Sequence, residues 1–192
     1  MGGMAECIDI VFETHSWSED NERGLASGWM PTPLSPKGRG LAQELGERRR
    51  HDGLAAVFVS DLRRAAETAA IAFAGTDVPV FHDWRLRECD YGDLTGRPAP
   101  EVHGTVAGVH DPYPGGESWA AAIRRVGGAL NDIHGRWRGH RVLVIGHMSA
   151  YWALRHFVDG MPLEDFGKGF EWQEGWELRM CAPADLGPAV SS

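Results

Sequence analysis

Short apolar runs alternate with helix-forming segments along most of this chain, and this alternation restricts its fold more than any other feature. Strands are predicted over residues 7–13, 55–60, 78–82 and 141–146 and, as a half-buried edge strand, over 175–180. Helices are predicted over residues 35–50, 61–73, 117–137 and 149–158. Strands that alternate with helices form a mostly parallel sheet, so we expect an α/β fold.

Two segments interrupt the alternation. A polar loop containing glycine is predicted from Thr14 to about Leu34, and residues 84–116 are rich in Gly, Pro and charge without a clear period. We interpret the second segment as irregular structure that borders an active site or forms a lid. The sequence has no internal repeat and no low-complexity linker, which predicts a single domain over residues 1–192 with a core of about 7–180.

The charge balance argues against two classes of partner. The 192 residues include 19 Lys and Arg against 27 Asp and Glu, for a formal net charge of −8. General binding of nucleic acid or of an anionic membrane needs a broad positive field, so neither partner is expected. Only Lys37 and Lys168 among the basic residues are lysines, and the rest are arginines.

The cysteine pattern bears on the compartment. Cys7, Cys89 and Cys181 lie far apart and show no CxxC spacing, so we expect no disulfide framework and a reducing cytoplasm as the natural setting. The first residues lack the pattern of a signal peptide, and no stretch approaches the roughly 18 apolar residues of a membrane span. These observations predict a cytoplasmic protein.

Chemically capable residues stand where three predicted strands give way to the next segment. His15 follows the first strand, Arg64 lies early in the helix after the second, and His147 follows the strand over 141–146. In parallel sheets ligands bind outside the carboxyl ends of the strands, so these side chains can meet there. Helix N-termini and an arginine favour an anion, and a neutral imidazole can attack phosphorus. The pattern indicates a phosphate site.

Six short blocks of residues occur in one order along the chain. They are Thr14-His15-Ser16 with Ser18 and Asn21, Gly28 with Pro33-Leu34-Ser35, Ser60-Asp61-Leu62-Arg63-Arg64-Ala65 with Thr68-Ala69, Leu86-Arg87-Glu88 with Tyr91-Gly92, Gly115-Gly116-Glu117-Ser118, and Val142 to His147. In this order they resemble the motifs of the histidine phosphatase superfamily, in the branch that includes phosphoglycerate mutases and small phosphomonoesterases. The resemblance extends from Ile8 to about Met180 and implies a three-layer α/β/α sandwich.

The resemblance also implies a role for each matched residue. His15 would attack phosphorus and become a transient phosphohistidine. Arg64, Asn21 and His147 would bind or stabilise the phosphoryl oxygens. Glu88 would protonate the leaving group and then activate water. The resemblance implies no metal and no cofactor, and the sequence has no HExxH-like spacing of metal ligands.

The signature of this family begins Arg-His-Gly, and the chain departs from it. Thr14 replaces the arginine and Ser16 replaces the glycine, and both would border the bound phosphate. The lost guanidinium removes a charge-assisted contact of about 1.5–3 kcal/mol. Arg23, Arg87 and Arg97 lie in segments that border the site in the family, and any of them could supply the missing charge.

Two functions remain open at the level of sequence. The first is a phosphomonoesterase that acts on a small phosphorylated metabolite through a phosphohistidine at His15. The alternative is a weak or inactive protein that binds phosphate or another anion on the same fold. A phosphoglycerate mutase is less favoured, because residues 98–114 contain no Lys or Arg and Cys89 stands where mutases have an arginine. Trp17 and Trp29 could wall an apolar leaving-group pocket, and an edge strand or exposed tryptophans could support a homodimer.

Overall fold

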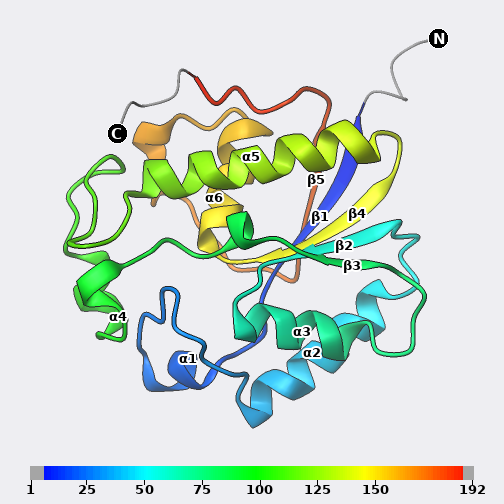
Figure 1. Ribbon diagram of the computed structural model, residues 1–192, viewed down its shortest axis with the longest axis horizontal. Helices are drawn as coiled ribbons and strands as arrows, with labels where there is room; N and C mark the ends of the chain where they lie inside the picture. Colours follow the sequence, from blue (N-terminus) through cyan, green and yellow to red (C-terminus); the bar gives the residue numbers. More distant parts are fainter. Residues whose placement is uncertain (1–6, 188–192) are drawn as a thin grey trace.

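A five-stranded sheet organises the computed structural model, which describes residues 7–187 (Figure 1). Its strands run in the order β3-β2-β4-β1-β5. Their bounds are β1 Ile8–Thr14, β2 Ala56–Val59, β3 Val80–His82, β4 Arg141–Gly146 and β5 Trp176–Met180. Strands β1 to β4 pair in parallel, and β5 is an antiparallel edge strand beside β1. The expected mostly parallel sheet is confirmed.

Two helical layers enclose the sheet. The helices α2 (Pro36–Arg49) and α3 (Arg63–Ala72) cover one face, while α5 (Trp119–Trp137) and α6 (Met148–Phe157) cover the other (Figure 1). Alternate strand residues supply the two cores, as period-two alternation requires. Phe12 and Val144 pack with α5 and α6, whereas Val11 and Leu143 pack with α3. The result is a three-layer α/β/α sandwich.

Local signals explain where the long helices begin and which face they bury. Ser35 caps α2 by accepting a hydrogen bond from the Gly38 amide, and Pro36 occupies the first turn. Ser118 caps α5 in the same way. Along α5 the buried side chains recur every three or four residues, at Trp119, Ala122, Ile123, Val126, Leu130 and Ile133.

Short helical segments lie where the sequence predicted none. Residues 14–34 contain α1 (Glu19–Arg23), which a capping box of Ser18 and Asn21 closes at its N-terminus. Residues 84–116 contain η1 (Trp84–Leu86), η2 (Gly92–Leu94) and α4 (Ala99–His103), and η3 (Leu163–Asp165) follows α6. These segments are too short for an apolar period to show in the sequence, so the prediction of uninterrupted loop was wrong there.

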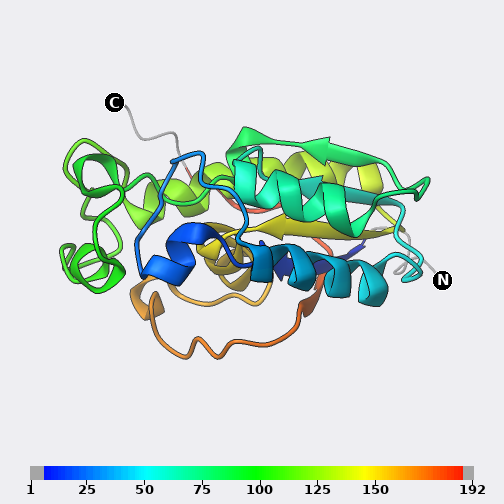
Figure 2. The same ribbon diagram turned by 90° about the horizontal axis from the view of Figure 1, so that it is seen from below.

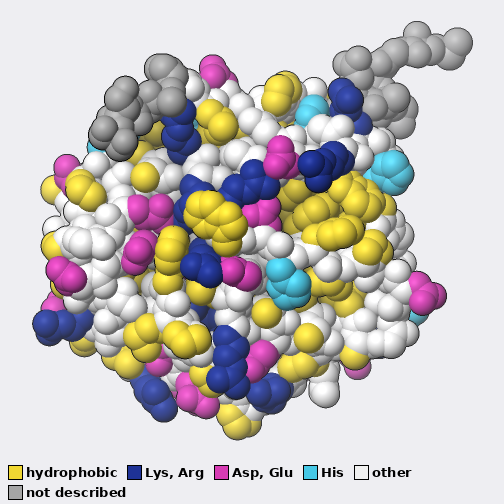
Figure 3. Space-filling model, viewed as in Figure 1, with side chains coloured by type: hydrophobic (Ala, Val, Ile, Leu, Met, Phe, Trp, Pro, Cys, Tyr) yellow, Lys and Arg dark blue, Asp and Glu magenta, His cyan; other side chains and the backbone are white. Residues whose placement is uncertain are grey.

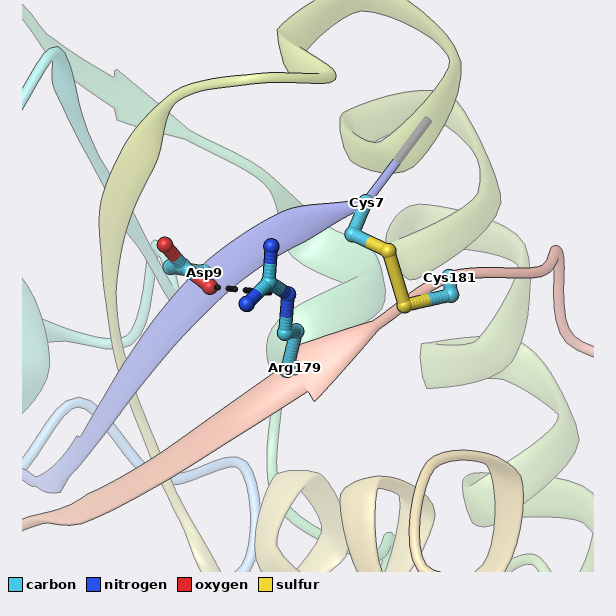
Figure 4. The surroundings of a disulfide bond; sticks show 4 residues. All are labelled: Cys7, Asp9, Arg179 and Cys181. Atoms are coloured by element: carbon cyan, nitrogen blue, oxygen red, sulfur yellow. Dashed lines mark ion pairs between the residues drawn. A yellow bond between two sulfur atoms is a disulfide. The ribbon is translucent and has the colours of Figure 1, made fainter. Parts of the chain in front are cut away.

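The cysteines correct another expectation. Cys7 and Cys181 form a disulfide with their Cα atoms 4.0 Å apart, although 174 residues separate them in sequence (Figure 4). The antiparallel register pairs Ile8 with Met180, which places Cys7, just before β1, opposite Cys181, just after β5. Spacing along the chain could not reveal this pairing, because it depends on β5 returning beside β1. Cys89 remains a buried free thiol whose pKa is raised, chiefly by burial.

The surface shown in Figure 3 mixes the two signs of charge. Lys and Arg side chains alternate there with Asp and Glu, and hydrophobic side chains gather beside the β2 and β3 edge of the sheet. Phe58, Phe81 and Trp137 contribute to that hydrophobic group, with ring centroids 5.5–6.0 Å apart. Within residues 7–187, no helix is long and apolar enough to cross a membrane.

Candidate active site

The carboxyl ends of β1, β2 and β4 bring His15, Arg64 and His147 together, as the sequence predicted. Register pairs Thr14 with Gly146, so the residues that follow these two strands are neighbours. The rings of His15 and His147 lie 4.9 Å apart between centroids. Arg64 enters from the first turn of α3, and its guanidinium contacts both rings. Figure 2 shows α1 and α4 at this end of the molecule, away from the N-terminus.

Hydrogen bonds define which nitrogen of His15 is free to react. Arg64 Nε donates to His15 Nε2 at 3.2 Å. A guanidinium has donors only, so His15 Nε2 must carry a lone pair. The other nitrogen, Nδ1, lies 2.7 Å from the Ser16 carbonyl oxygen and therefore donates its proton to it. His15 is thus a neutral imidazole with its nucleophilic Nε2 directed towards Arg64.

Hydrogen bonds likewise fix the tautomer of His147, which is the opposite of that of His15. Arg64 Nη2 lies 3.3 Å from His147 Nδ1, which must accept, so the Nε2–H donates to Ser60 Oγ at 2.9 Å. Burial and the Arg64 charge lower the pKa of His15 to about 3 and lower the pKa of His147 well below its ordinary value. Both rings therefore stay neutral at physiological pH.

Arg64 is a buried cation that forms no ion pair with a carboxylate within residues 7–187. Its side chain is almost fully buried, and besides the two imidazoles it donates to the carbonyl oxygens of Gly28 at 2.9 Å and Met30 at 3.4 Å. Burial lowers the pKa of Arg64, opposed by the charges of Glu88, Tyr91 and Asp20. Gly28 can present its carbonyl because it adopts a φ of +48°. An oxyanion would satisfy this guanidinium far better than carbonyl groups do.

Glu88 reaches the same site from the loop after η1. Its Oε1 accepts hydrogen bonds from the Cys89 amide at 2.9 Å and the Ser149 amide at 3.1 Å, and its Oε2 accepts one from the Met148 amide at 3.2 Å. Two of these amides belong to the first turn of α6, where the helix dipole favours negative charge. The carboxyl group is therefore fixed at the N-terminus of α6, directly after His147.

These side chains surround one cavity of about 190 Å³. It is lined by Thr14, His15, Asn21, Leu25, Ala26, Ser27, Gly28, Arg64, Glu88, Tyr91, Ala99, His103, His147 and Met148. Asn21 uses its amide oxygen to cap α1 by accepting from Ser18, and among the described residues its Nδ2 donor has no partner. The cavity is large enough for a phosphoryl group and a small leaving group.

The three arginines considered as charge replacements lie elsewhere. Arg87 pairs with Asp61 through two hydrogen bonds of 2.7 Å and stacks on the Trp29 ring. Arg23 pairs with Glu19 and Asp20, and Arg97 pairs with Glu101, both with largely exposed side chains. None of the three lines the 190 Å³ cavity. Thr14 does line it, and Ser16 lies beside it, held by a hydrogen bond from its amide to Thr68 Oγ1 at 3.0 Å.

Sequence reasoning missed several residues that support the site. Ser60 orients His147, and Arg125 donates to the carbonyl oxygens of Arg85, Arg87 and Glu88 while pairing with Glu117. Tyr91 and His103 line the cavity. Ser60 follows a strand directly, which was a usable signal, but Arg125 and His103 come from distant segments that only the folded chain brings near.

Within residues 7–187, no group of three or more His, Cys, Asp or Glu side chains is arranged to hold a metal ion. The positive charge at the site comes instead from Arg64 and from the helix N-termini.

A three-layer sandwich with two histidines and an arginine at its strand ends defines a histidine-phosphatase type of fold and site. The chain belongs to the histidine phosphatase superfamily (branch 1), whose family model matches residues 10–173. It is 33% identical over 171 residues to a 2,3-bisphosphoglycerate-dependent phosphoglycerate mutase of Methylobacterium sp. (strain 4-46), covering 81% of this chain and 82% of the relative. It is 31% identical over 164 residues to the probable phosphoglycerate mutase GpmB of Salmonella typhi, covering 81% and 76%.

Solved structures share the same architecture. Bacillus stearothermophilus YhfR superposes with a TM-score of 0.78 at 28% identity, covering 87% of each chain. The mycobacterial glucosyl-3-phosphoglycerate phosphatase Rv2419c, in complex with VO3, superposes with a TM-score of 0.71 at 25% identity, covering 82% of this chain and 84% of that one. Relatives of this chain therefore include both phosphatases and mutases.

Proposed function

We propose that this protein is a metal-independent phosphomonoesterase that acts on a small phosphorylated metabolite through a phosphohistidine at His15. The observation that carries the proposal is the buried Arg64 guanidinium, which lies between two neutral imidazoles and has no carboxylate partner in the described part of the chain. A buried cation of this kind is stabilised by a dianionic phosphoryl group, and His15 Nε2 carries a lone pair beside it.

In the first step Arg64 Nε turns its hydrogen bond from His15 Nε2 to a phosphoryl oxygen. The freed Nε2 lone pair then forms a bond to phosphorus while the bond from phosphorus to the leaving oxygen breaks. Arg64 and Asn21 Nδ2 donate hydrogen bonds to the phosphoryl oxygens. His147 joins them once its Nδ1 carries a proton, which a dianionic phosphoryl group beside the ring favours. The leaving oxygen takes a proton from Glu88. The Oε2 atom of Glu88 accepts only one backbone hydrogen bond and is the oxygen with room to carry that proton.

In the second step water attacks phosphorus of the phosphohistidine, and the bond from phosphorus to Nε2 breaks. The Glu88 carboxylate takes a proton from the attacking water, which restores the acid for the next cycle. Inorganic phosphate leaves, and His15 returns to the neutral tautomer in which Nδ1–H donates to the Ser16 carbonyl.

Hydrolysis is favoured over mutase activity by the side chains around the leaving group. A mutase must hold a phosphorylated carboxylate, which calls for cations. Among the residues that line the 190 Å³ cavity there is no arginine other than Arg64 and no lysine. Cys89, where mutases have an arginine, is buried and has its Sγ 3.8 Å from the Glu117 carbonyl oxygen.

A second candidate is a protein that binds phosphate on the same site with little turnover. Thr14 favours it, because a hydroxyl stands where the family signature has a guanidinium. The presence of His15, Glu88 and His147 in one cavity favours the enzyme. The two candidates differ in turnover and in whether His15 becomes phosphorylated.

The test is release of inorganic phosphate from a panel of phosphate monoesters with a chelator present. We expect turnover by the native protein and a loss of about a thousandfold or more in His15→Ala. His51→Ala is the matched control, because His51 is exposed just after α2. Acid-labile phosphate trapped on His15 after rapid quenching would support the covalent step.

Two results would contradict the proposal. Equal rates in the native protein and in His15→Ala would exclude His15 as the nucleophile. Saturable phosphate binding without turnover of any ester would support the anion-binding candidate.

We propose a cytoplasmic protein, in agreement with the prediction from sequence. A reducing compartment would then hold Cys7 and Cys181 as thiols, and the antiparallel pairing of β1 and β5 would have to hold this edge of the sheet without the disulfide.

A further inference from the structure

A second, much larger cavity adjoins the reaction centre. Its volume is about 890 Å³, and its walls come mainly from two connecting segments, residues 104–113 after α4 and residues 163–170 after α6, with further side chains from α5 and α6. Figure 2 shows the chain around α4 and the chain after α6 approaching each other at this end of the molecule. The walls are largely apolar and include Val106, Val109, Tyr113, Trp119, Trp152, Leu163, Phe166 and Phe170.

The large cavity joins the smaller one through shared wall residues. Tyr91, His103 and Met148 line both. The Met148 amide donates to Glu88 Oε2, so the proton donor for the leaving group stands at the boundary between the two cavities. A group that leaves phosphorus past Glu88 therefore enters the large cavity.

The nucleophile lies on the other side of the reaction centre. In-line displacement places the attacking and leaving atoms on opposite sides of phosphorus. His15 and Thr14 line the small cavity and a third cavity near Trp17 and Trp172, but neither lines the large one. The third cavity therefore adjoins the nucleophile, whereas the large cavity, which shares Met148 and Phe170 with the third, lacks His15 and lies beside Glu88.

The charged groups of the large cavity limit what it can accept. Asp111 and Glu164 line it, and neither forms an ion pair among the described residues. Lys168 also lines it, but its ammonium pairs with Asp165 at 2.9 Å. A leaving group that carried a carboxylate or a second phosphate would meet two carboxylates there, and the basic side chains of this lining are only His103, His110 and the paired Lys168.

From this geometry we infer that the large cavity is a leaving-group site for uncharged, apolar alcohols, aromatic ones above all. The inference rests on the proposed function, since the leaving group is defined by attack of His15. It names the substrate class as phosphate monoesters of bulky apolar alcohols rather than phosphorylated acids. Trp29, suggested by the sequence as a wall of such a pocket, lies instead against Arg87 and Arg125.

Binding and turnover test the inference separately. Phenylbutylphosphonate, butylphosphonate and carboxybutylphosphonate are non-hydrolysable and share one phosphorus group, and calorimetry gives their affinities. We expect the phenyl compound to bind about 10- to 100-fold more tightly than butylphosphonate, and the carboxylate to bind more weakly than either. Turnover of phenylpropyl phosphate, propyl phosphate and carboxypropyl phosphate, whose alcohols are similarly acidic, should follow the same order in kcat/KM.

A substitution in the wall of the large cavity tests whether the phenyl group binds there. Ala107 is exposed on the rim of the large cavity, and Ala107→Trp should fill part of it and reduce the preference for the phenyl compound about tenfold. Ala70→Trp is the matched control, because Ala70 is exposed on α3 and lines none of the three cavities. It should keep the native preference.

The possible outcomes test the leaving-group site and the proposed hydrolysis independently. Equal affinity for phenylbutylphosphonate and butylphosphonate, or tighter binding of carboxybutylphosphonate, would overturn the leaving-group site. A clear phenyl preference in binding without turnover of any ester would uphold the site and overturn the proposed hydrolysis. A phenyl preference unchanged by Ala107→Trp would place the aromatic group elsewhere and overturn the assignment.

Discussion

The two sides of the reaction centre are built in different ways. On the phosphate side, His15, Arg64 and His147 project from strand ends or a helix start and are fixed by hydrogen bonds of 2.7–3.4 Å. On the leaving-group side, the walls belong to connecting segments and are mostly apolar. Strand ends hold polar groups in fixed directions, whereas connecting segments can change in length and composition without disturbing the sheet. The difference assigns the proposed chemistry to residues held by the sheet and the proposed specificity to the connecting segments.

The largest loss of kcat/KM is expected from Arg64→Lys, on the phosphate side. Lysine keeps the charge but cannot donate at once to His15, His147 and the Gly28 carbonyl, so kcat/KM should fall by about 100- to 1,000-fold for every ester alike. Arg63→Lys, next to it and exposed, should change little. Steady-state kinetics on the apolar and charged esters measures both. A loss confined to the apolar esters would break the division between the two sides.

A gain in affinity for phosphate is expected from Thr14→Arg. Thr14 lines both the reaction cavity and the neighbouring one, so a longer side chain can reach the phosphate. The restored guanidinium should tighten binding of phosphate or vanadate by about 1.5–3 kcal/mol, or roughly 10- to 100-fold. Calorimetry with each oxyanion checks this, and Thr14→Gln controls for size without charge. Unchanged affinity would show that Thr14 does not face the anion.

Burial of His15 on the phosphate side should also make the free energy of unfolding depend on pH. The pKa of His15 is about 3 in the folded chain, below the ordinary value of about 6.5 for an unfolded histidine. Between these values the unfolded state binds more protons, so the free energy of unfolding falls as pH falls. His15 adds a slope of about 1.4 kcal/mol per pH unit over this range. Urea unfolding at several pH values should show a shallower slope in His15→Asn.

The exposed His51 provides the control for that experiment. His51→Asn should keep the native slope, because the structure gives this side chain no buried environment. An equal slope in the native protein and in His15→Asn would mean that His15 carries its proton in the folded state. Nitrogen NMR of the ring should show the neutral Nδ1–H tautomer in the native protein.

The smallest effect on activity is expected from loss of the disulfide. Cys7 precedes β1 and His15 follows it, so about 26 Å of extended chain separates the bond from the reaction centre. Cys7→Ser should lower the free energy of unfolding by about 2–4 kcal/mol and leave kcat/KM unchanged. Urea unfolding and kinetics of the same sample measure both quantities. A large loss of kcat/KM would show that the disulfide end of the sheet affects activity at the site.

Much of the architecture could be predicted from local pattern. The apolar run at 141–146 and the Ser-Pro start of the helix at 35 give β4 and α2 within about one residue, because each depends on neighbours in the sequence. The motif order also marked His15, Arg64, His147 and Glu88, and the structure places all four around one cavity. Their catalytic roles remain proposals.

Other features depended on segments that meet only in the folded chain. The register of β1 with β4 sets the His15–His147 pair, and the antiparallel return of β5 joins Cys7 to Cys181. The pairing of Arg87 with Asp61 keeps that arginine from the phosphate side, which no motif revealed. Sequence determined the elements and the reactive residue types, because propensity and periodicity are local. Tertiary structure decided which distant residues share a cavity, because those contacts depend on strand order and register.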